Sequence, residues 1–127
     1  MKNAILVIED NEQNMYLTTF ILEKHGYTVY QARNGRAGIE LVEQVKPDLI
    51  LLDIQLPEMD GYAVARELRQ SPALLHTAIV AVTSYAMAGD RERILAAGCD
   101  GYIEKPINPD TFMAEIEKYL DHQTGVG

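Results

Sequence analysis

The chain has 127 residues, of which 47% are hydrophobic, and its formal net charge at pH 7 is −8. This length suits one domain around one core, and the hydrophobic share excludes a disordered chain. The negative charge argues against nucleic acid as a partner, since binding it needs a basic surface. No apolar stretch is long enough to span a bilayer and no signal peptide begins the chain, so no membrane partner is expected. The single cysteine, Cys99, excludes an internal disulfide and fits a reducing, cytoplasmic compartment.

Five short apolar or β-branched segments alternate along the chain with five segments of helical periodicity. The expected strands are Ala4–Ile8, Thr28–Gln31, Leu49–Leu52, Ala78–Val82 and Gly101–Glu104. The expected helices are Asn11–His25, Gly35–Gln44, Tyr62–Gln70, Gly89–Ala97 and Pro109 to about Asp121. This alternation with short loops predicts an α/β fold, a single doubly wound domain with a five-stranded parallel sheet. The usual strand order for such a flavodoxin-like domain is 2-1-3-4-5.

The first expected helix carries apolar residues at two sets of positions. Its predicted core stripe has four members at helical spacing, Tyr16, Leu17, Phe20 and Ile21. Met15 and Leu22 leave that stripe and are therefore candidates for contact with a partner. Gly26 is placed to end the helix with a positive φ. At the other end of the chain, residues 122–127 carry no periodicity and are expected to be a disordered tail behind a domain of residues 1–121.

Asp53 is the most informative residue, because it follows the all-apolar run Leu49–Leu52. Such a run is typical of a central strand that is buried on both faces. A carboxylate at the end of a buried strand is costly unless it is paired. In open α/β sheets, ligands bind in the crevice at the carboxyl ends of the strands. Asp53 is therefore the first candidate for a functional residue.

Polar residues follow the other expected strands at the same edge of the sheet. They are Glu9-Asp10, Thr83-Ser84 and Lys105-Pro106. Three carboxylates close together repel one another, and a divalent cation relieves this repulsion. Oxygen ligands without thiol or imidazole favour Mg²⁺ or Mn²⁺, often held together with a phosphate. A lysine and a hydroxyl beside an aspartate and a metal are the groups needed to form an aspartyl phosphate.

Over residues 4–120, the sequence resembles the receiver domain of two-component response regulators, whose fold is that of the chemotaxis regulators. The residues that carry the resemblance stand in order at the strand ends: Glu9-Asp10, Asp53 followed by Pro57 and Gly61, Thr83, and Lys105-Pro106. A finer likeness is to single-domain regulators of the DivK type and to receivers of hybrid histidine kinases. It rests on the segments Asp10–Asn14, Ala81–Met87 and Gly98-Cys99.

The resemblance implies a phosphorylation switch that signals through proteins and is not a conventional enzyme. Asp53 would accept a phosphoryl group from a phosphohistidine of a histidine kinase or a histidine phosphotransfer protein, in a Mg²⁺-dependent transfer that the domain itself catalyses. Thr83 and Lys105 would bind the phosphoryl oxygens, and Tyr102 would move inward after Thr83. The implied metal ligands are the carboxylates of Glu9, Asp10 and Asp53 and the backbone carbonyl of Gln55.

The resemblance also implies partner surfaces and a special peptide bond. The kinase-side contacts would be Asn11, Asn14, Met15, Pro106 and Ile107, and the Lys105–Pro106 bond would be cis. The fourth helix, fifth strand and last helix would form the face that a downstream protein target recognises, on a monomer or a weak homodimer. Gln55 and Tyr85 are expected to set the dephosphorylation rate.

Other classes of protein are weighed against the same residues. A haloacid-dehalogenase-type phosphatase needs a second aspartate where Gln55 stands, and a P-loop nucleotidase needs a glycine-rich loop that the sequence lacks. A flavodoxin would have a hydroxyl-rich phosphate loop in place of Glu9-Asp10-Asn11. Two alternatives stay open: a receiver-like docking module that works without phosphorylation, and a receiver cut from a larger hybrid histidine kinase.

Overall fold

The structure is a computed structural model, and it describes residues 3–56, 59–84 and 88–124. Five parallel strands form one sheet in the order β2-β1-β3-β4-β5, as predicted. The strands are β1 Ala4–Ile8, β2 Thr28–Ala32, β3 Leu49–Asp53, β4 Ala78–Thr83 and β5 Gly101–Glu104. The helices are α1 Glu12–Lys24, α2 Gly35–Val45, α3 Gly61–Arg69, α4 Ala88–Ala96 and α5 Pro109–Thr124, with a short 3₁₀ turn at Pro72–Leu74.

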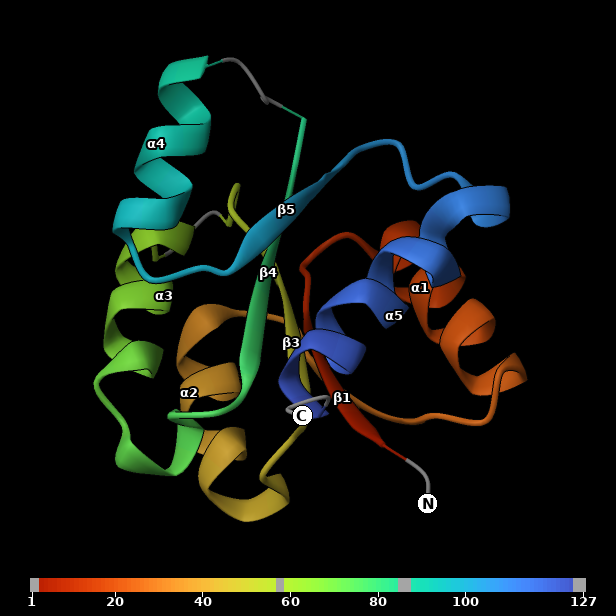
Figure 1. Cartoon of the computed structure of the whole chain (residues 1–127), viewed down its shortest axis with the longest axis horizontal. Coiled ribbons are helices and arrows are strands. Elements are labelled where there is room, and N and C mark those ends of the chain that lie inside the picture. Colours follow the sequence, from red (N-terminus) through yellow and green to blue (C-terminus); the bar gives the residue numbers. More distant parts are fainter. Residues whose placement is uncertain (1–2, 57–58, 85–87, 125–127) are drawn as a thin grey trace.

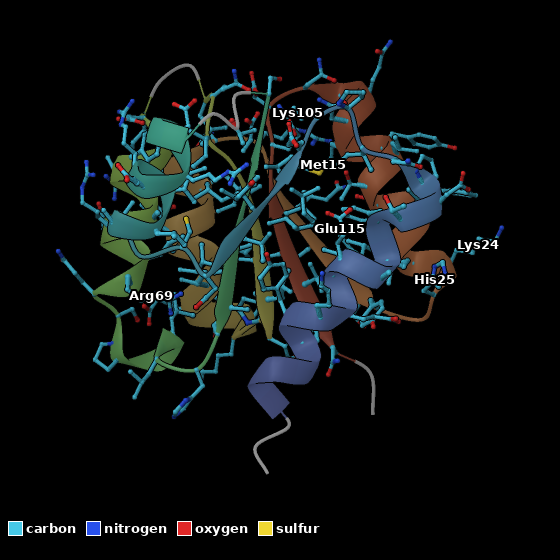
Figure 2. The ribbon with its side chains drawn as sticks, turned by 45° about the horizontal axis from the view of Figure 1, so that its top comes forward. Met15, Lys24, His25, Arg69, Lys105 and Glu115 are labelled. Atoms are coloured by element: carbon cyan, nitrogen blue, oxygen red, sulfur yellow. The ribbon has the colours of Figure 1, made fainter. Side chains whose placement is uncertain are left out.

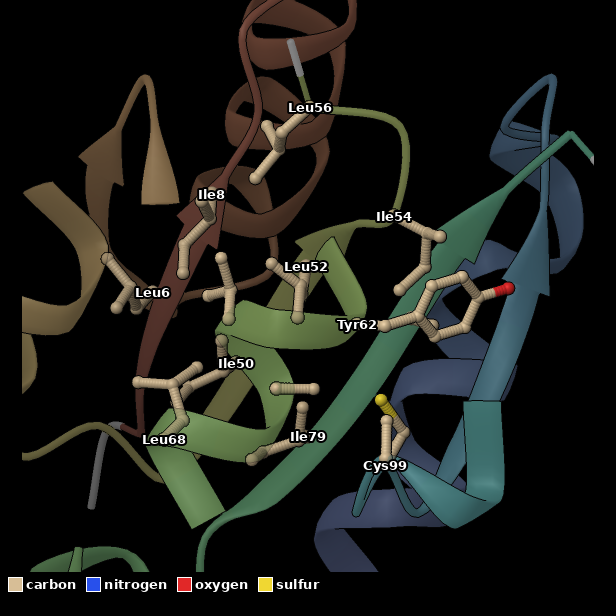
Figure 3. Close-up of a cluster of buried hydrophobic side chains, with 14 of the residues drawn as sticks. Leu6, Ile8, Ile50, Leu52, Ile54, Leu56, Tyr62, Leu68, Ile79 and Cys99 are labelled. Atoms are coloured by element: carbon tan, nitrogen blue, oxygen red, sulfur yellow. The ribbon is translucent and has the colours of Figure 1, made fainter. Parts of the chain in front are cut away.

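Helices cover both faces of the sheet, so that the domain has three layers. Helices α2, α3 and α4 lie on one face, and α1 and α5 lie on the other (Figure 1). Because side chains alternate along a strand, each strand supplies two separate cores. Leu6 and Ile8 of β1 belong to the core beneath α2, α3 and α4, which Figure 3 shows, whereas Ile5 and Val7 belong to the core beneath α1 and α5.

The register of the strands brings the predicted polar residues to one edge. Ile8 is level with Leu52 across β1 and β3, and Asp53 is level with Val82 of β4. Thr83, one residue further along, is level with Glu104 of β5. Glu9, Asp53, Thr83 and Lys105 therefore all lie at the carboxyl ends of adjacent strands.

The prediction for the core stripe of α1 holds for Ile21, which is 7% exposed, and for Leu17, which packs against the core beneath α1 and α5. It was wrong for the other two residues. Tyr16 and Phe20 are 72% and 52% exposed, whereas Met15 and Leu22, which were predicted to leave the core, are 1% and 0% exposed. The helix buries a stripe that includes the polar Thr18, and a polar residue in its middle hides this stripe from a count of apolar positions. The rings of Tyr16 and Phe20 stack on each other on the outer surface instead, with centroids 6.2 Å apart.

Two glycines allow the chain to turn where the fold requires it. Gly26 has a φ of 93° directly after α1, as predicted from its position. Gly61 begins α3 so close to the Ile54 backbone that a Cβ would overlap it, which lets the loop after β3 fold back beside Asp53. Helix α5 reaches Thr124, three residues past its predicted end, and residues 125–127 lie outside the described residues. In the described part of the chain, no helix has the length and apolar character needed to cross a membrane.

Candidate functional site

Asp53 is the last residue of β3, and its side chain is 2% exposed. Its Oδ1 atom accepts a hydrogen bond of 2.8 Å from the backbone N–H of Gln55. That bond turns the chain sharply after the strand and fixes one carboxylate oxygen. The buried carboxylate that the sequence predicted is therefore present at the edge of the sheet.

Two further acids lie beside it, at the end of β1. Glu9 is buried and its Oε2 accepts a hydrogen bond of 3.2 Å from the N–H of Asn11, whereas Asp10 is exposed. Glu9, Asp10 and Asp53 each offer a carboxylate oxygen, and these oxygens lie within 4.8 Å of one another. The three acids that the sequence predicted as metal ligands are thus brought together.

Lys105 is the cation of the site, and it lies directly after β5. Its Nζ is 3.1 Å from Oδ1 of Asp53 and 3.9 Å from Oε1 of Glu9. Figure 2 shows Lys105 at the same end of the sheet as Met15 and far from Arg69. The Lys105–Pro106 peptide bond is cis, which is the form that the resemblance implies.

One ammonium group does not balance this cluster of acids. The pKa of Glu9 is raised from 4.5 to about 7, first by burial and then by the adjacent Asp53, whose effect exceeds the lowering by Lys105. A carboxyl whose ionisation is opposed in this way gains from a bound cation. The oxygen-only donor set and the excess of negative charge fit Mg²⁺ or Mn²⁺.

The end of β4 also adjoins the loop that follows β3. Thr83 is buried at the end of β4, and the backbone N–H of Ser84 donates a hydrogen bond of 3.3 Å to Oε1 of Gln55. The Gln55 side chain therefore joins the loops that follow β3 and β4, a contact that the sequence did not predict. Pro57 and Tyr85, which belong to the predicted motifs, lie outside the described residues.

The proposed partner contacts differ in how accessible they are. Asn11 is exposed and accepts a hydrogen bond of 2.9 Å from the Asn14 N–H as the cap of α1, and Pro106 is exposed. Ile107 is only 9% exposed. Met15 is buried, so its assignment as a partner contact is corrected: it packs in the core beneath α1 and α5.

A small cavity adjoins the carboxylates on the side of α1 and α5. Its lining includes Glu9, Asp53 and Lys105 together with Thr18 and Phe112. Thr18 and Phe112 were not predicted to be neighbours of the site. Thr18 could have been found from the sequence, because it is a polar residue at a helical position between apolar ones, close to the acidic end of the first strand. Such a residue is a candidate for lining a site.

A comparison with known families decides what this arrangement belongs to. The family model of the response regulator receiver domain matches residues 5–117. The chain belongs to the response regulator receiver family. Its fold is that of a receiver domain, which acts as a signalling switch.

Individual relatives agree with this assignment. The receiver is 43% identical to the polar-differentiation response regulator DivK of Brucella anthropi, over 94% of this chain and 98% of that protein. It superposes with a TM-score of 0.91 on a CheY-like receiver domain protein from Methanospirillum hungatei, at 31% identity over the whole of both chains. The receiver domain of a sensor histidine kinase from Pseudomonas aeruginosa gives a TM-score of 0.84 at 34% identity, over 98% of this chain and 99% of that one. That structure has a magnesium ion coordinated in its active site cleft.

Proposed function

We propose that Asp53 is the phosphoacceptor of this receiver, and that a phosphohistidine of a histidine kinase or a histidine phosphotransfer protein is the donor. The observation that carries this proposal is the Asp53 carboxylate, buried at the end of β3 with the Lys105 ammonium 3.1 Å away. A carboxylate in this setting is held in place and partly neutralised, yet it stays at the edge of the sheet that ligands reach.

The transfer forms one bond and breaks another. An Asp53 carboxylate oxygen attacks phosphorus as the phosphorus–nitrogen bond to the donor histidine breaks, and the bonding pair stays on the imidazole. Oδ1 already accepts the Gln55 N–H and faces Lys105 Nζ, so the other oxygen, Oδ2, is the better nucleophile. Lys105 then neutralises a phosphoryl oxygen, and the Thr83 hydroxyl donates a hydrogen bond to another.

Glu9, Asp10 and Asp53 would hold Mg²⁺, with the Gln55 backbone carbonyl as a further ligand. When bound, the ion would supply positive charge that offsets the charge of the incoming phosphoryl group. The chain's own contribution is to hold the carboxylate oxygens within 4.8 Å of one another before the ion arrives. Glu9 is fixed for this by its hydrogen bond from the Asn11 N–H.

The output is a shift between two conformations. Movement of Thr83 toward the phosphoryl oxygens would vacate space for the half-buried Tyr102, and so change the face made by α4, β5 and α5. Moving a two-state balance from 1:99 to 99:1 takes about 5.5 kcal/mol of differential interaction. The altered face would bind a downstream protein, or the phosphoryl group would be relayed to a phosphotransfer protein.

Residues near the site, of which Asn11 and Pro106 are exposed and Asn14 is half-buried, are the proposed contacts of the phosphodonor. Asn11, Asn14 and Pro106 follow the ends of β1 and β5 and would touch the donor protein, together with the nearly buried Ile107. We infer that the receiver works as a monomer or a weak homodimer. The free and buried Cys99 is compatible with a cytoplasmic location for this reaction.

Intact mass after incubation with Mg²⁺ and acetyl phosphate tests the proposal. The wild type is expected to gain one phosphoryl group, and Asp53→Asn is expected to gain none. Asp100→Asn, which changes a carboxylate at the opposite end of the sheet, is the matched control and should still be phosphorylated. Stoichiometric phosphorylation of Asp53→Asn would overturn the assignment. A wild type that neither gains mass nor binds Mg²⁺ would favour a docking module that works without phosphorylation.

A further inference from the structure

Two arginines of α4 each lie over a tyrosine of a neighbouring element. The guanidinium carbon of Arg91 is 5.7 Å from the ring centroid of Tyr102 on β5, and that of Arg93 is 4.2 Å from the ring centroid of Tyr62 on α3. Both distances fall within the range of a cation–π contact. The two contacts attach α4 to the body of the domain on two sides.

The two tyrosines differ in what they can do. Tyr62 is 8% exposed and belongs to the core beneath α2, α3 and α4, so its ring has little room to move (Figure 3). Tyr102 is only partly buried and lies on the edge strand, where it lines a shallow groove with Glu104 and Glu115. The Arg93 contact is therefore fixed, whereas the Arg91 contact involves a ring that can leave it.

The interaction that the structure gives for Arg91 is its contact with the Tyr102 ring. In the part of the chain that the structure describes, Arg91 forms no ion pair, although acidic residues are common in the protein. Its side chain is exposed at the surface, where the guanidinium stays hydrated. A guanidinium held at the surface cannot follow a ring that moves into the interior.

We propose that Arg91 is a positioning residue that holds Tyr102 in its half-exposed conformation and so biases the receiver toward the unphosphorylated state. This inference rests on the proposed function, because it concerns the switch that follows phosphorylation of Asp53. The contact exists in the conformation described here and is lost when the ring turns inward. Removing Arg91 therefore raises the population of the inward state. A surface cation–π contact changes such an equilibrium by about two- to fivefold.

The test is the affinity for beryllofluoride, an analogue of the phosphoryl group, measured by calorimetry with Mg²⁺ present. A mimic that favours the inward state binds more tightly when that state is more populated. Arg91→Ala is expected to bind beryllofluoride about two- to fivefold more tightly than the wild type. In a Tyr102→Leu background, where the ring is absent, Arg91→Ala should leave the affinity unchanged. In NMR, the ring carbon chemical shift of Tyr102 should also differ between Arg91→Ala and the wild type before the mimic is added. In the variant it should lie closer to the value of the beryllofluoride-bound protein.

Arg93→Ala is the matched control, because it removes the same kind of contact from the same helix. It should lower stability but leave beryllofluoride affinity within experimental error of the wild type. The inference is overturned if Arg91→Ala binds with unchanged or weaker affinity, or if the gain persists without the Tyr102 ring. A wild type that does not bind beryllofluoride would overturn the proposed function as well, which separates the two failures.

Discussion

Two polar clusters lie at opposite ends of the same sheet, one around Arg69 and one around Lys105 (Figure 2). They differ in how far their positive and negative charges balance. At the amino end, the Arg69 guanidinium donates to the backbone carbonyls of Gly98, Leu74 and Thr77 at 3.0, 3.0 and 3.1 Å. It also bonds Oδ2 of Asp100 at 2.9 Å. One cation faces one anion there, and four donor–acceptor contacts satisfy the guanidinium.

At the carboxyl end, one cation faces several anions. Lys105 lies near Asp53 and Glu9, while Asp10 adds a third carboxylate to the same few ångströms. The raised pKa of Glu9, at about 7, shows that its charge is poorly compensated. We therefore infer different roles for the two clusters. The balanced cluster around Arg69 stabilises the fold, whereas the unbalanced cluster around Asp53 can bind a cation and a phosphoryl group.

The largest expected effect is at the balanced end. Arg69→Ala removes four hydrogen bonds and leaves the Gly98 and Thr77 carbonyls without this donor, so it should lower the free energy of unfolding by about 3–5 kcal/mol. Urea denaturation measures this change, with the exposed Arg66→Ala from the same turn of α3 as the control. Phosphorylation by acetyl phosphate should persist in whatever fraction stays folded. A cost below that of the control would show that these hydrogen bonds do not hold the amino end together.

Glu9→Gln should raise the free energy of unfolding, whereas Arg69→Ala lowers it. The pKa of Glu9 is raised from 4.5 to about 7, so between these values the native state holds a proton that the unfolded chain has lost. The free energy of unfolding of the metal-free wild type therefore falls as pH rises through this range. Glu9→Gln avoids the loss, and its gain over the wild type should grow from near zero at pH 4.5 to about 3 kcal/mol at pH 8.

Urea denaturation at several pH values between 4.5 and 8, without divalent cations, measures the difference between these two proteins. Glu12→Gln, which changes an exposed acid at the start of α1, serves as the control and should track the wild type. A Glu9→Gln gain that is the same at every pH would contradict the assignment of a raised pKa to Glu9.

The sequence was sufficient for the fold and for the set of residues in the unbalanced cluster. The run Leu49–Leu52 indicated a buried strand, and the order of strands in such folds placed Glu9, Asp53 and Lys105 at one edge. These inferences needed only two kinds of information. Hydrophobic periodicity is a local property of the sequence, and the rules for connecting parallel strands leave few possible topologies.

The sequence was not sufficient where two patterns of similar strength competed. On α1, the apolar pairs at 16/20 and 17/21 had the spacing of a core stripe. Of these, Ile21 is buried as predicted, but its buried neighbours are Met15, Thr18 and Leu22. Which face is buried depends on how α1 packs against the sheet and α5, which no local pattern contains. The Arg69 cluster was missed for the same reason, since its partners come from two segments distant in the sequence, 74–77 and 98–100.

Magnesium should affect only the unbalanced end, and by a smaller amount. At free Mg²⁺ ten times its dissociation constant, binding to the native state adds about 1.4 kcal/mol to the free energy of unfolding. Asp10→Asn should lose much of this gain, whereas Asp100→Asn should keep it because Asp100 lies outside the group of three close acids. Thermal denaturation with and without Mg²⁺ measures both. Equal gains in the two variants would place the ion elsewhere.

The smallest effect is expected for an exposed ion pair. It tests whether the stability at the amino end comes from partly buried hydrogen bonds or from charge pairing alone. Arg33 pairs with Glu12 at 3.3 Å, but both side chains are largely exposed, and Arg33 lacks the set of carbonyl partners that Arg69 has. Exposed pairs gain little because water and salt screen them, so Arg33→Ala should cost no more than about 0.5 kcal/mol, and less at high salt. Urea denaturation of Arg33→Ala and Arg69→Ala side by side gives the comparison. A similar cost for both would mean that charge pairing alone, and not the carbonyls gathered around a half-buried guanidinium, stabilises the amino end.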